Sequence, residues 1–220
     1  MLGRRFDEAV AYAAIVHGAH FRKGTGGAGP AVPYIAHLLG VAGLVLEDGG
    51  GEDETIAALL HDAVEDQGGQ PRLDDIRRRF GDRVAAIVRA ASDAIPDPGS
   101  PKPEFWGRKC AHLEHLAQIE GDLAVPLLRV TMADKLSNLR ATVRDARVGG
   151  AEFWAVFSQG PASQLWYYGR MIDIFCDRCR SSSMLPELED LLVQLGRLVP
   201  EQERVLAERY RIEKCPPVRG

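Results

Sequence analysis

The stretch EDETIAALLHDAVED, residues 52–66, decides how the rest of the chain is interpreted. It begins with three acidic residues, which favour the positive end of a helix, and continues as an apolar run typical of a buried helix. A helix that only filled a core would not then place a histidine and three carboxylates within a turn and a half. These four residues are His61, Asp62, Glu65 and Asp66. The pattern therefore predicts one buried helix with a group of functional side chains at its C-terminal end.

Helical spacing of apolar residues continues on both sides of this stretch. Apolar residues recur at intervals of three and four between residues 4 and 21, and Pro33 opens a second helix that the glycines at 49–51 end. Further helices are predicted for residues 73–81, 82–94, 104–119, 122–146, 162–179, 186–199 and 201–212. No run alternates polar and apolar residues as a strand does, so the predicted fold class is all-α.

Composition narrows the class of protein. The chain has 220 residues, 45% hydrophobic and 26% charged, which is typical of a globular domain rather than a disordered one. A net charge of −4 gives no basic surface for long nucleic acids, and no apolar run approaches the ~20 residues of a membrane span. With four cysteines and no secretory signal, the sequence predicts a cytoplasmic protein without nucleic-acid or membrane partners.

Histidine and carboxylate side chains interrupt the apolar patterns of three predicted helices. The candidates are His37, His61, Asp62 and Asp134. An isolated histidine of this kind is usually a core or surface residue, so the inference rests on the combination. Imidazole nitrogens and carboxylate oxygens form a ligand set suited to Mn²⁺, Fe²⁺ or Zn²⁺, and facing helices of a bundle can bring such ligands together.

Taken in order, these motifs resemble the hydrolase domain of RelA/SpoT-type alarmone enzymes, which are HD-domain metal-dependent phosphohydrolases. The family pattern is an R-K pair, P-Y-x-x-H, H-D-x-x-E-D and D-K-x-x-N-L-R. It is matched here by residues 22–23, 33–37, 61–66 and 134–140. The R-K pair and the E-D extension separate this family from general HD phosphohydrolases. The similarity covers roughly residues 5 to 180.

The resemblance implies a single-domain HD-fold helical bundle with a metal site in the core cleft. The HD domain is expected over residues 1–180, with residues 181–220 as a C-terminal helical extension that packs on it. The implied activity is metal-dependent hydrolysis of the 3′-pyrophosphate of (p)ppGpp to GDP or GTP and pyrophosphate, by a small alarmone hydrolase. The alternative is an HD phosphohydrolase for another nucleotide or phosphorylated dinucleotide. A catalytically silent alarmone-binding module ranks last, because no motif residue is missing.

Residue roles also follow from the resemblance. One Mn²⁺, or another divalent transition metal, is implied to be held by His37, His61, Asp62 and Asp134. Glu65 and Asp66 are implied to orient the attacking water or accept its proton, and on one continuous helix each follows a metal ligand by one turn.

The substrate is expected to be a guanine nucleotide. The residues implied to hold its guanosine are Arg22, Lys23 and Asn138. Asn138 follows Asp134 by one helical turn and should point into the same pocket. The planar guanidinium of Arg22 suits stacking on a purine.

A second group is implied to meet the pyrophosphate. Residues 101–110, PKPEFWGRKC, resemble a segment of the short family members, in which Arg108 and Lys109 bring positive charge to a polyphosphate. In LWYYGR, Tyr167 or Tyr168 is expected to donate a hydrogen bond there. The sequence does not distinguish these two tyrosines, and we take Tyr168 as the candidate.

One stretch departs from the family pattern. The segment RKGTGGAGPAVPY, residues 22–34, is longer and richer in glycine than the usual link between the R-K and P-Y motifs. This length is expected to loosen Arg22 and Lys23 relative to His37. Tyr34 is expected to pack behind His37 rather than to contact substrate.

Overall fold

The structure, a computed structural model, describes residues 1–22, 31–92 and 104–214. The α-helices are α1 (Arg4–Val16), α2 (Ile35–Glu47), α3 (Glu52–Leu60), α4 (Ala63–Gln67), α5 (Gly69–Phe80), α6 (Asp82–Ala91), α7 (Phe105–Gln118), α8 (Ala124–Gly149), α9 (Gly160–Arg178), α10 (Leu185–Leu198) and α11 (Glu201–Glu213). A 3₁₀ helix, η1 (Gly150–Val156), follows α8. The predicted all-α class is confirmed, since the one β-type contact within these ranges is an isolated bridge between Phe21 and Pro33.

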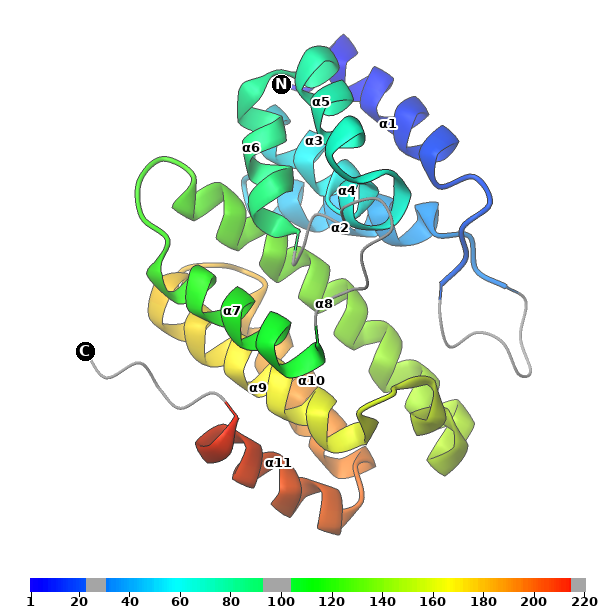
Figure 1. Cartoon of the computed structure of the whole chain (residues 1–220), viewed down its shortest axis with the longest axis vertical. Coiled ribbons are helices and arrows are strands. Elements are labelled where there is room, and N and C mark those ends of the chain that lie inside the picture. Colours follow the sequence, from blue (N-terminus) through cyan, green and yellow to red (C-terminus); the bar gives the residue numbers. More distant parts are fainter. Residues whose placement is uncertain (23–30, 93–103, 215–220) are drawn as a thin grey trace.

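The long helix α8 lies at the centre of the molecule (Figure 1). Helices α2, α3 and α6 pack on one side of it, and α9, α10 and η1 pack on the other. Helix α7 and helix α11 then cover α9. Leu38, Ile56 and Leu127 are fully buried where the first side meets α8. The single helix α8 therefore contacts both groups of helices, and its side chains can meet residues of each group.

Two glycines mark the ends of helices at positive φ. Gly81, with φ of 93°, separates α5 from α6, as the sequence predicts. Gly150, with φ of 56°, ends α8 and starts η1. The sequence analysis did not predict η1, because a 3₁₀ turn has no apolar period of its own.

The prediction of one continuous helix over residues 52–66 is wrong. Helix α3 ends at Leu60 and α4 begins at Ala63, so His61 and Asp62 lie in a turn between them. The bond from the Asp66 amide to the Asp62 carbonyl, at 3.0 Å, keeps the chain close to helical across this turn.

A partly buried ion-pair cluster joins α8 to α2 and α3. Arg129 of α8 donates to Asp48, at the end of α2, over 3.0 Å, and also to Glu54 of α3. Asp48 accepts further bonds from the hydroxyls of Ser182 and Ser183. Burial would raise the pKa of Asp48, but these donors hold it below its usual range. The ion pairs fix α8 against α2, which carries His37, and against α3, which ends just before His61.

The segment after α1 is held against the start of α2. The amide of Arg22 donates to the carbonyl of Val32 over 3.0 Å, and that of Tyr34 donates to the carbonyl of His20 over 2.8 Å. The expected loosening is therefore wrong for the backbone of Arg22, while Lys23 lies outside the described residues.

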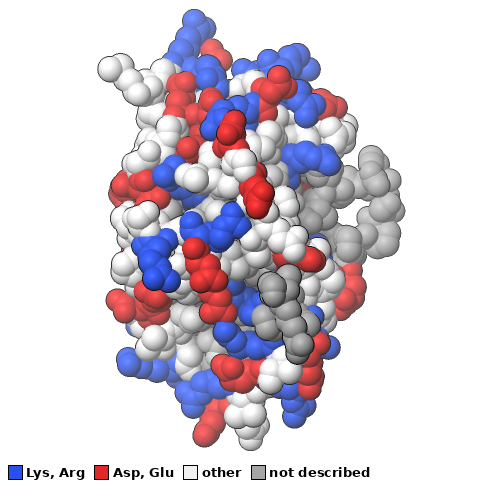
Figure 2. Space-filling view, turned by 90° about the vertical axis from the view of Figure 1, so that its left-hand side faces the viewer, with Lys and Arg blue, Asp and Glu red and all other residues white. Residues whose placement is uncertain are grey.

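The C-terminal helices pack on α8 and α9. Arg140 of α8 forms a two-pronged ion pair with Glu187 of α10, at 2.7 and 2.6 Å. A domain boundary near residue 180 stays a prediction. Within the described ranges, no helix has the length and apolarity needed to cross a membrane. On the face that Figure 2 shows, basic and acidic side chains alternate rather than forming areas of one sign.

Candidate active site

Three side chains from separate segments meet beside α8. His37 comes from α2, His61 from the turn after α3, and Asp134 from the middle of α8. Each offers a ligand atom, and these atoms lie within 4.8 Å of one another. Oδ1 of Asp134 lies 3.2 Å from Nε2 of His37 and 3.5 Å from Nε2 of His61. We refer to these three residues together with Asp62 as the acidic histidine cluster.

Asp62 completes the cluster from the side of His61. Its Oδ2 atom lies 2.9 Å from Nε2 of His61 and 3.8 Å from Nε2 of His37. The break between α3 and α4 thus places the histidine and the aspartate of one dipeptide around the same point. Sequence reasoning grouped these four residues correctly in space, although it placed two of them on a regular helix.

The opposite ring nitrogens of both histidines have partners. Nδ1 of His61 donates to the carbonyl of Ala58 over 2.8 Å, and Nδ1 of His37 lies 2.9 Å from the hydroxyl of Ser137. Both Nε2 atoms are buried and lack a hydrogen-bond partner among the described residues. Buried polar atoms without partners are rare, and this orientation is the one that metal-binding histidines adopt. The donor set therefore fits a divalent metal ion.

The electrostatics of the cluster favour a bound positive charge. Burial would lower the pKa of His61, but the carboxylates of Asp62 and Asp134 raise it well above its ordinary value. Burial lowers the pKa of His37. Asp134 would have a raised pKa from burial alone, yet the ammonium of Lys135 and the close Nε2 atoms of both histidines hold this pKa well below its usual range. The cluster therefore carries ionised carboxylates in a buried position.

Tyr34 does more than pack behind His37. Its ring lies edge-on to His37, with centroids 5.3 Å apart, as expected, but its hydroxyl also donates a hydrogen bond to Asp62. The other face of the ring stacks on His20 at a centroid distance of 4.0 Å. Burial and the nearby Asp62 raise the pKa of Tyr34, so the hydroxyl stays protonated and donating.

A chain of hydrogen bonds leads outward from Asp134. Nδ2 of Asn138 donates to Asp134 over 2.5 Å, and the guanidinium of Arg22 donates to the side-chain oxygen Oδ1 of Asn138 over 3.0 Å. Lys135 contacts the other carboxylate oxygen of Asp134 at 2.7 Å. Arg22 and Asn138, both predicted to hold substrate, are therefore brought to the cluster.

A cleft of about 410 Å³ opens beside the cluster. Its near end is formed by His20, Arg22, Tyr34, Asp66 and Asn138. Glu65, the other predicted catalytic carboxylate, is half-buried on α4 and does not line the cleft. The two adjacent carboxylates thus face different surroundings.

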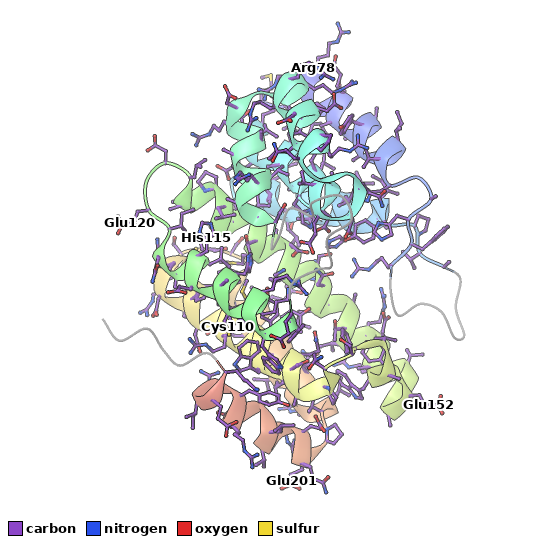
Figure 3. All side chains as sticks on the ribbon, viewed as in Figure 1. Arg78, Cys110, His115, Glu120, Glu152 and Glu201 are labelled. Atoms are coloured by element: carbon purple, nitrogen blue, oxygen red, sulfur yellow. The ribbon has the colours of Figure 1, made fainter. Side chains whose placement is uncertain are left out.

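The far end of the cleft lies along the C-terminal part of α8. It is formed by Thr142, Asp145, Phe153, Phe157, Gln159 and Gln164, whereas Tyr168 lines the cleft closer to Lys135. Glu152, labelled in Figure 3, marks the end of the molecule where α8 gives way to η1, away from α2 and α3. Sequence reasoning missed most of this wall, because η1 was not predicted.

The residues predicted to meet the pyrophosphate lie beside this cleft. Tyr168 lines it, and burial raises the pKa of Tyr168 to about 12. Tyr167 does not line it; the ammonium groups of Lys109 and Lys135 lie 4.5 and 5.7 Å from the centre of its ring. Arg108 and Lys109 are half-buried on α7, whose first residue borders the cleft.

Sequence reasoning assigned no supporting role to three residues beside the cluster, namely His20, Lys135 and Ser137, and for Tyr34 it predicted the packing on His37 but not the bond to Asp62. The role of Lys135 could have been predicted from the sequence, because a cation next to Asp134 can neutralise a buried carboxylate. The role of Ser137 could not have been predicted, since its partner His37 is 100 residues away in the sequence.

Residues 9–157 match the family described as HD domain. The chain belongs to the HD domain family. The resemblance seen in the motifs is therefore confirmed, and the match covers the helices that carry the acidic histidine cluster of this HD domain.

Curated relatives of this HD domain include guanosine-3′,5′-bis(diphosphate) 3′-pyrophosphohydrolases named MESH1. The human protein is 35% identical over 147 residues, which are 66% of this chain and 73% of that protein. The Xenopus tropicalis protein is 37% identical over 122 residues, which are 54% of this chain and 62% of that protein. This HD domain chain thus spans a little under two thirds of the Xenopus protein.

Solved structures share the fold. One is described as a metazoan ortholog of SpoT that hydrolyses ppGpp; it superposes with a TM-score of 0.68 at 24% identity, covering 89% of this chain and 98% of that one. A Listeria monocytogenes EGD-e protein, lmo0812, gives a TM-score of 0.61 at 26% identity, covering 73% and 99%. The predicted HD-fold bundle is therefore confirmed.

Proposed function

We propose that this HD domain protein is a metal-dependent hydrolase that removes the 3′-pyrophosphate of (p)ppGpp, giving GDP or GTP and pyrophosphate. One observation carries the proposal: two buried imidazole Nε2 atoms, which form no hydrogen bond within the described residues, face Asp62 and Asp134 at the near end of a nucleotide-sized cleft. The names of the MESH1 relatives supply the substrate.

The proposed metal ligands are His37, His61, Asp62 and Asp134. Mn²⁺ is the proposed ion because the family resemblance implies it, and the borderline-to-hard set of imidazole and carboxylate donors is compatible with it. When bound, such an ion lowers the pKa of a coordinated water and withdraws charge from a phosphoryl oxygen. Ser137, the Ala58 carbonyl, Tyr34 and Lys135 hold the ligands in place, and outer partners of this kind support metal affinity.

Glu65 and Asp66 are the proposed catalytic carboxylates. Hydrolysis of the 3′-ester requires that a water molecule lose a proton and that the leaving oxygen gain one. Asp66 lies at the cleft wall one turn beyond Asp62, and Glu65 lies one turn beyond His61. A carboxylate in this position orients water and accepts its proton.

The proposed guanosine contacts are Arg22, Lys23 and Asn138. Arg22 reaches Asn138, and Asn138 reaches Asp134, so the ribose of a guanosine bound here would lie next to the metal ligands, with its base farther along α8. The proposed pyrophosphate contacts are Arg108, Lys109 and Tyr168. The cation of Lys109 is held over Tyr167, one residue from Tyr168 on α9. A planar guanidinium and an ammonium are both suited to a polyphosphate.

The proposal includes a cytoplasmic location and a small-molecule guanine nucleotide as the partner, as the sequence predicts. The competing function is hydrolysis of another nucleotide, such as a 3′-phosphorylated dinucleotide, by the same cluster. A binding module without turnover is the third possibility, and the complete ligand set argues against it.

The deciding experiment is an assay of pyrophosphate release from ppGpp by chelator-treated protein with and without added Mn²⁺. We expect turnover that depends on the metal and no comparable turnover of a 3′-phosphorylated dinucleotide. Turnover of the dinucleotide alone would support the competing function. Tight binding of ppGpp without any product would instead indicate the binding module.

A further inference from the structure

One face of α8 forms a continuous wall of the cleft. Asn138, Ala141, Thr142 and Asp145 all line it, and they follow one another at intervals of three, one and three residues. At 1.5 Å per residue, Asp145 lies roughly 16 Å along the helix from Asp134. Asp134 belongs to the acidic histidine cluster, so α8 sets a fixed separation between that cluster and the carboxylate of Asp145. This separation is long enough for a phosphate group and a nucleoside in between.

The far end of the cleft has the composition of a base-binding pocket. Phe153 and Phe157 form an edge-to-face pair, with ring centres 5.5 Å apart, and both line the cleft. Such rings offer flat apolar surface to a purine. Among the described residues that line the cleft, the carboxylates are Asp66 and Asp145. Asp66 lies next to the cluster, so Asp145 is the acidic group of the far end.

The carboxylate of Asp145 is largely buried and fixed. Its side chain is 18% exposed, and Oδ1 accepts a hydrogen bond from Nε of Arg144 over 2.8 Å. A carboxylate has about four acceptor sites and no donor, so this bond leaves both oxygens able to accept further bonds. A ligand that presents two neighbouring N–H donors would be complementary to it.

We infer that Asp145 is a specificity-determining residue that recognises guanine through its ring N1–H and its 2-amino group. This inference rests on the proposed function and assigns the base selectivity of the same site. Guanine presents these two donors side by side, whereas hypoxanthine lacks the amino group and adenine has an acceptor at N1. Hydrogen bonds to a charged acceptor contribute more than neutral ones, so a carboxylate here separates these bases.

The experiment compares kcat/KM for ppGpp and for its inosine analogue in wild type and in Asp145→Ala. Wild type should favour the guanosine substrate by about tenfold or more, because the inosine analogue leaves one bond to the carboxylate unmade. In Asp145→Ala the ratio should fall to about one, mainly through a higher KM for ppGpp, with kcat nearly unchanged. Asp145→Asn, which keeps the shape and one acceptor, should give an intermediate ratio.

Two variants serve as controls. Arg144→Ala removes the neighbouring guanidinium but keeps the carboxylate, so the ratio should stay close to that of wild type. Asp190→Asn changes an exposed carboxylate on α10 and should leave kcat/KM unchanged for both substrates. Thermal unfolding of each variant checks that the fold is kept.

The outcomes separate the two proposals. If folded Asp145→Ala hydrolyses ppGpp with an unchanged ratio, or if wild type does not discriminate between the substrates, Asp145 does not recognise guanine and the proposed function still stands. If wild type does not hydrolyse ppGpp at all, the proposed function fails. Equilibrium binding of GDP and IDP to wild type and Asp145→Ala then still decides whether Asp145 selects the base.

Discussion

The two ends of the cleft are built in different ways. At the near end, the functional side chains have partners that are buried or half-buried: His37 contacts Ser137, His61 donates to the Ala58 carbonyl, and Asp134 pairs with Lys135. At the far end, aromatic rings form the walls and a few polar groups stand at the edge, with Gln159 exposed and Gln164 half-buried.

This difference indicates how the two kinds of task are met. A metal site needs fixed distances and fixed protonation, which buried second partners provide. A site that selects among flat bases needs stacking surface and a small number of directed polar groups. Loss of a metal ligand at the near end should therefore abolish turnover, whereas loss of Asp145 at the far end should alter which base is preferred.

The largest effect is expected for Asp134→Asn. The amide keeps the shape of the side chain but loses the charge that faces both histidines, so the protein should lose its metal and about 10³-fold or more of its activity. Metal analysis of purified protein should fall from about one ion per chain to almost none. A full metal content in the variant, with an unchanged melting temperature, would contradict the assignment of Asp134 as a ligand.

Glu65→Gln should reduce turnover by about 10²-fold while the metal is kept, because a group that orients water is lost but no ligand is. Single-turnover kinetics and metal analysis on the same sample measure both quantities. If the variant releases its metal, Glu65 is a ligand rather than a catalytic carboxylate. Either outcome decides whether Glu65 belongs with the metal ligands or with the catalytic carboxylates of the near end.

Tyr34→Phe tests whether the partners of the ligands matter. The variant removes the hydroxyl that holds Asp62, so metal affinity should fall by about 10- to 100-fold while the ring still packs on His20. The matched control is Tyr12→Phe, which removes a hydroxyl bonded to Asp75, outside the cleft. Titration of metal into stripped protein should distinguish the two, and equal affinities would assign Tyr34 to packing alone.

The smallest effects concern substrate contacts. Arg22→Ala should raise the KM for ppGpp by about tenfold with a smaller change in kcat, because it leaves a polar partner unpaired. Lys109→Ala should lower kcat as well, since a cation beside the pyrophosphoryl group stabilises its negative charge while it passes from the ribose 3′-oxygen to water. Arg4→Ala, a change in an exposed ion pair, is the control. Equal losses confined to kcat in both variants would mean that the two ends of the substrate are wrongly assigned.

Much of the fold was predictable from periodicity. Helices α5 and α6 and the stop at Gly81 agree with the sequence analysis, because an amphipathic pattern and a positive-φ glycine are both local properties. The break at His61 and Asp62 was not predictable, since both residues keep nearly helical torsions and the break serves contacts with α2 and α8.

The candidate site shows the same limit. The motif around Asp134 predicted that Asn138 would lie one turn away, and the two side chains do meet. The bond from Tyr34 to Asp62 joins residues 28 apart, and the far wall of the cleft depends on where η1 folds back. Such partners are set by tertiary packing, which no local spacing reveals. Lys23 was predicted to bind substrate but lies outside the described residues.

The pair of backbone bonds that joins Arg22 to Val32 and Tyr34 to His20 has a consequence for how this family can diversify. Because these bonds fix the chain at Arg22 and at Val32, the positions of these two residues do not depend on the number of residues between them. The entropy cost of closing a loop grows only logarithmically, by about 0.6 kcal/mol for each doubling of its length. Homologous chains can therefore gain or lose residues between these anchors, and a peptide tag can be inserted there, while Arg22 keeps its place beside Asn138.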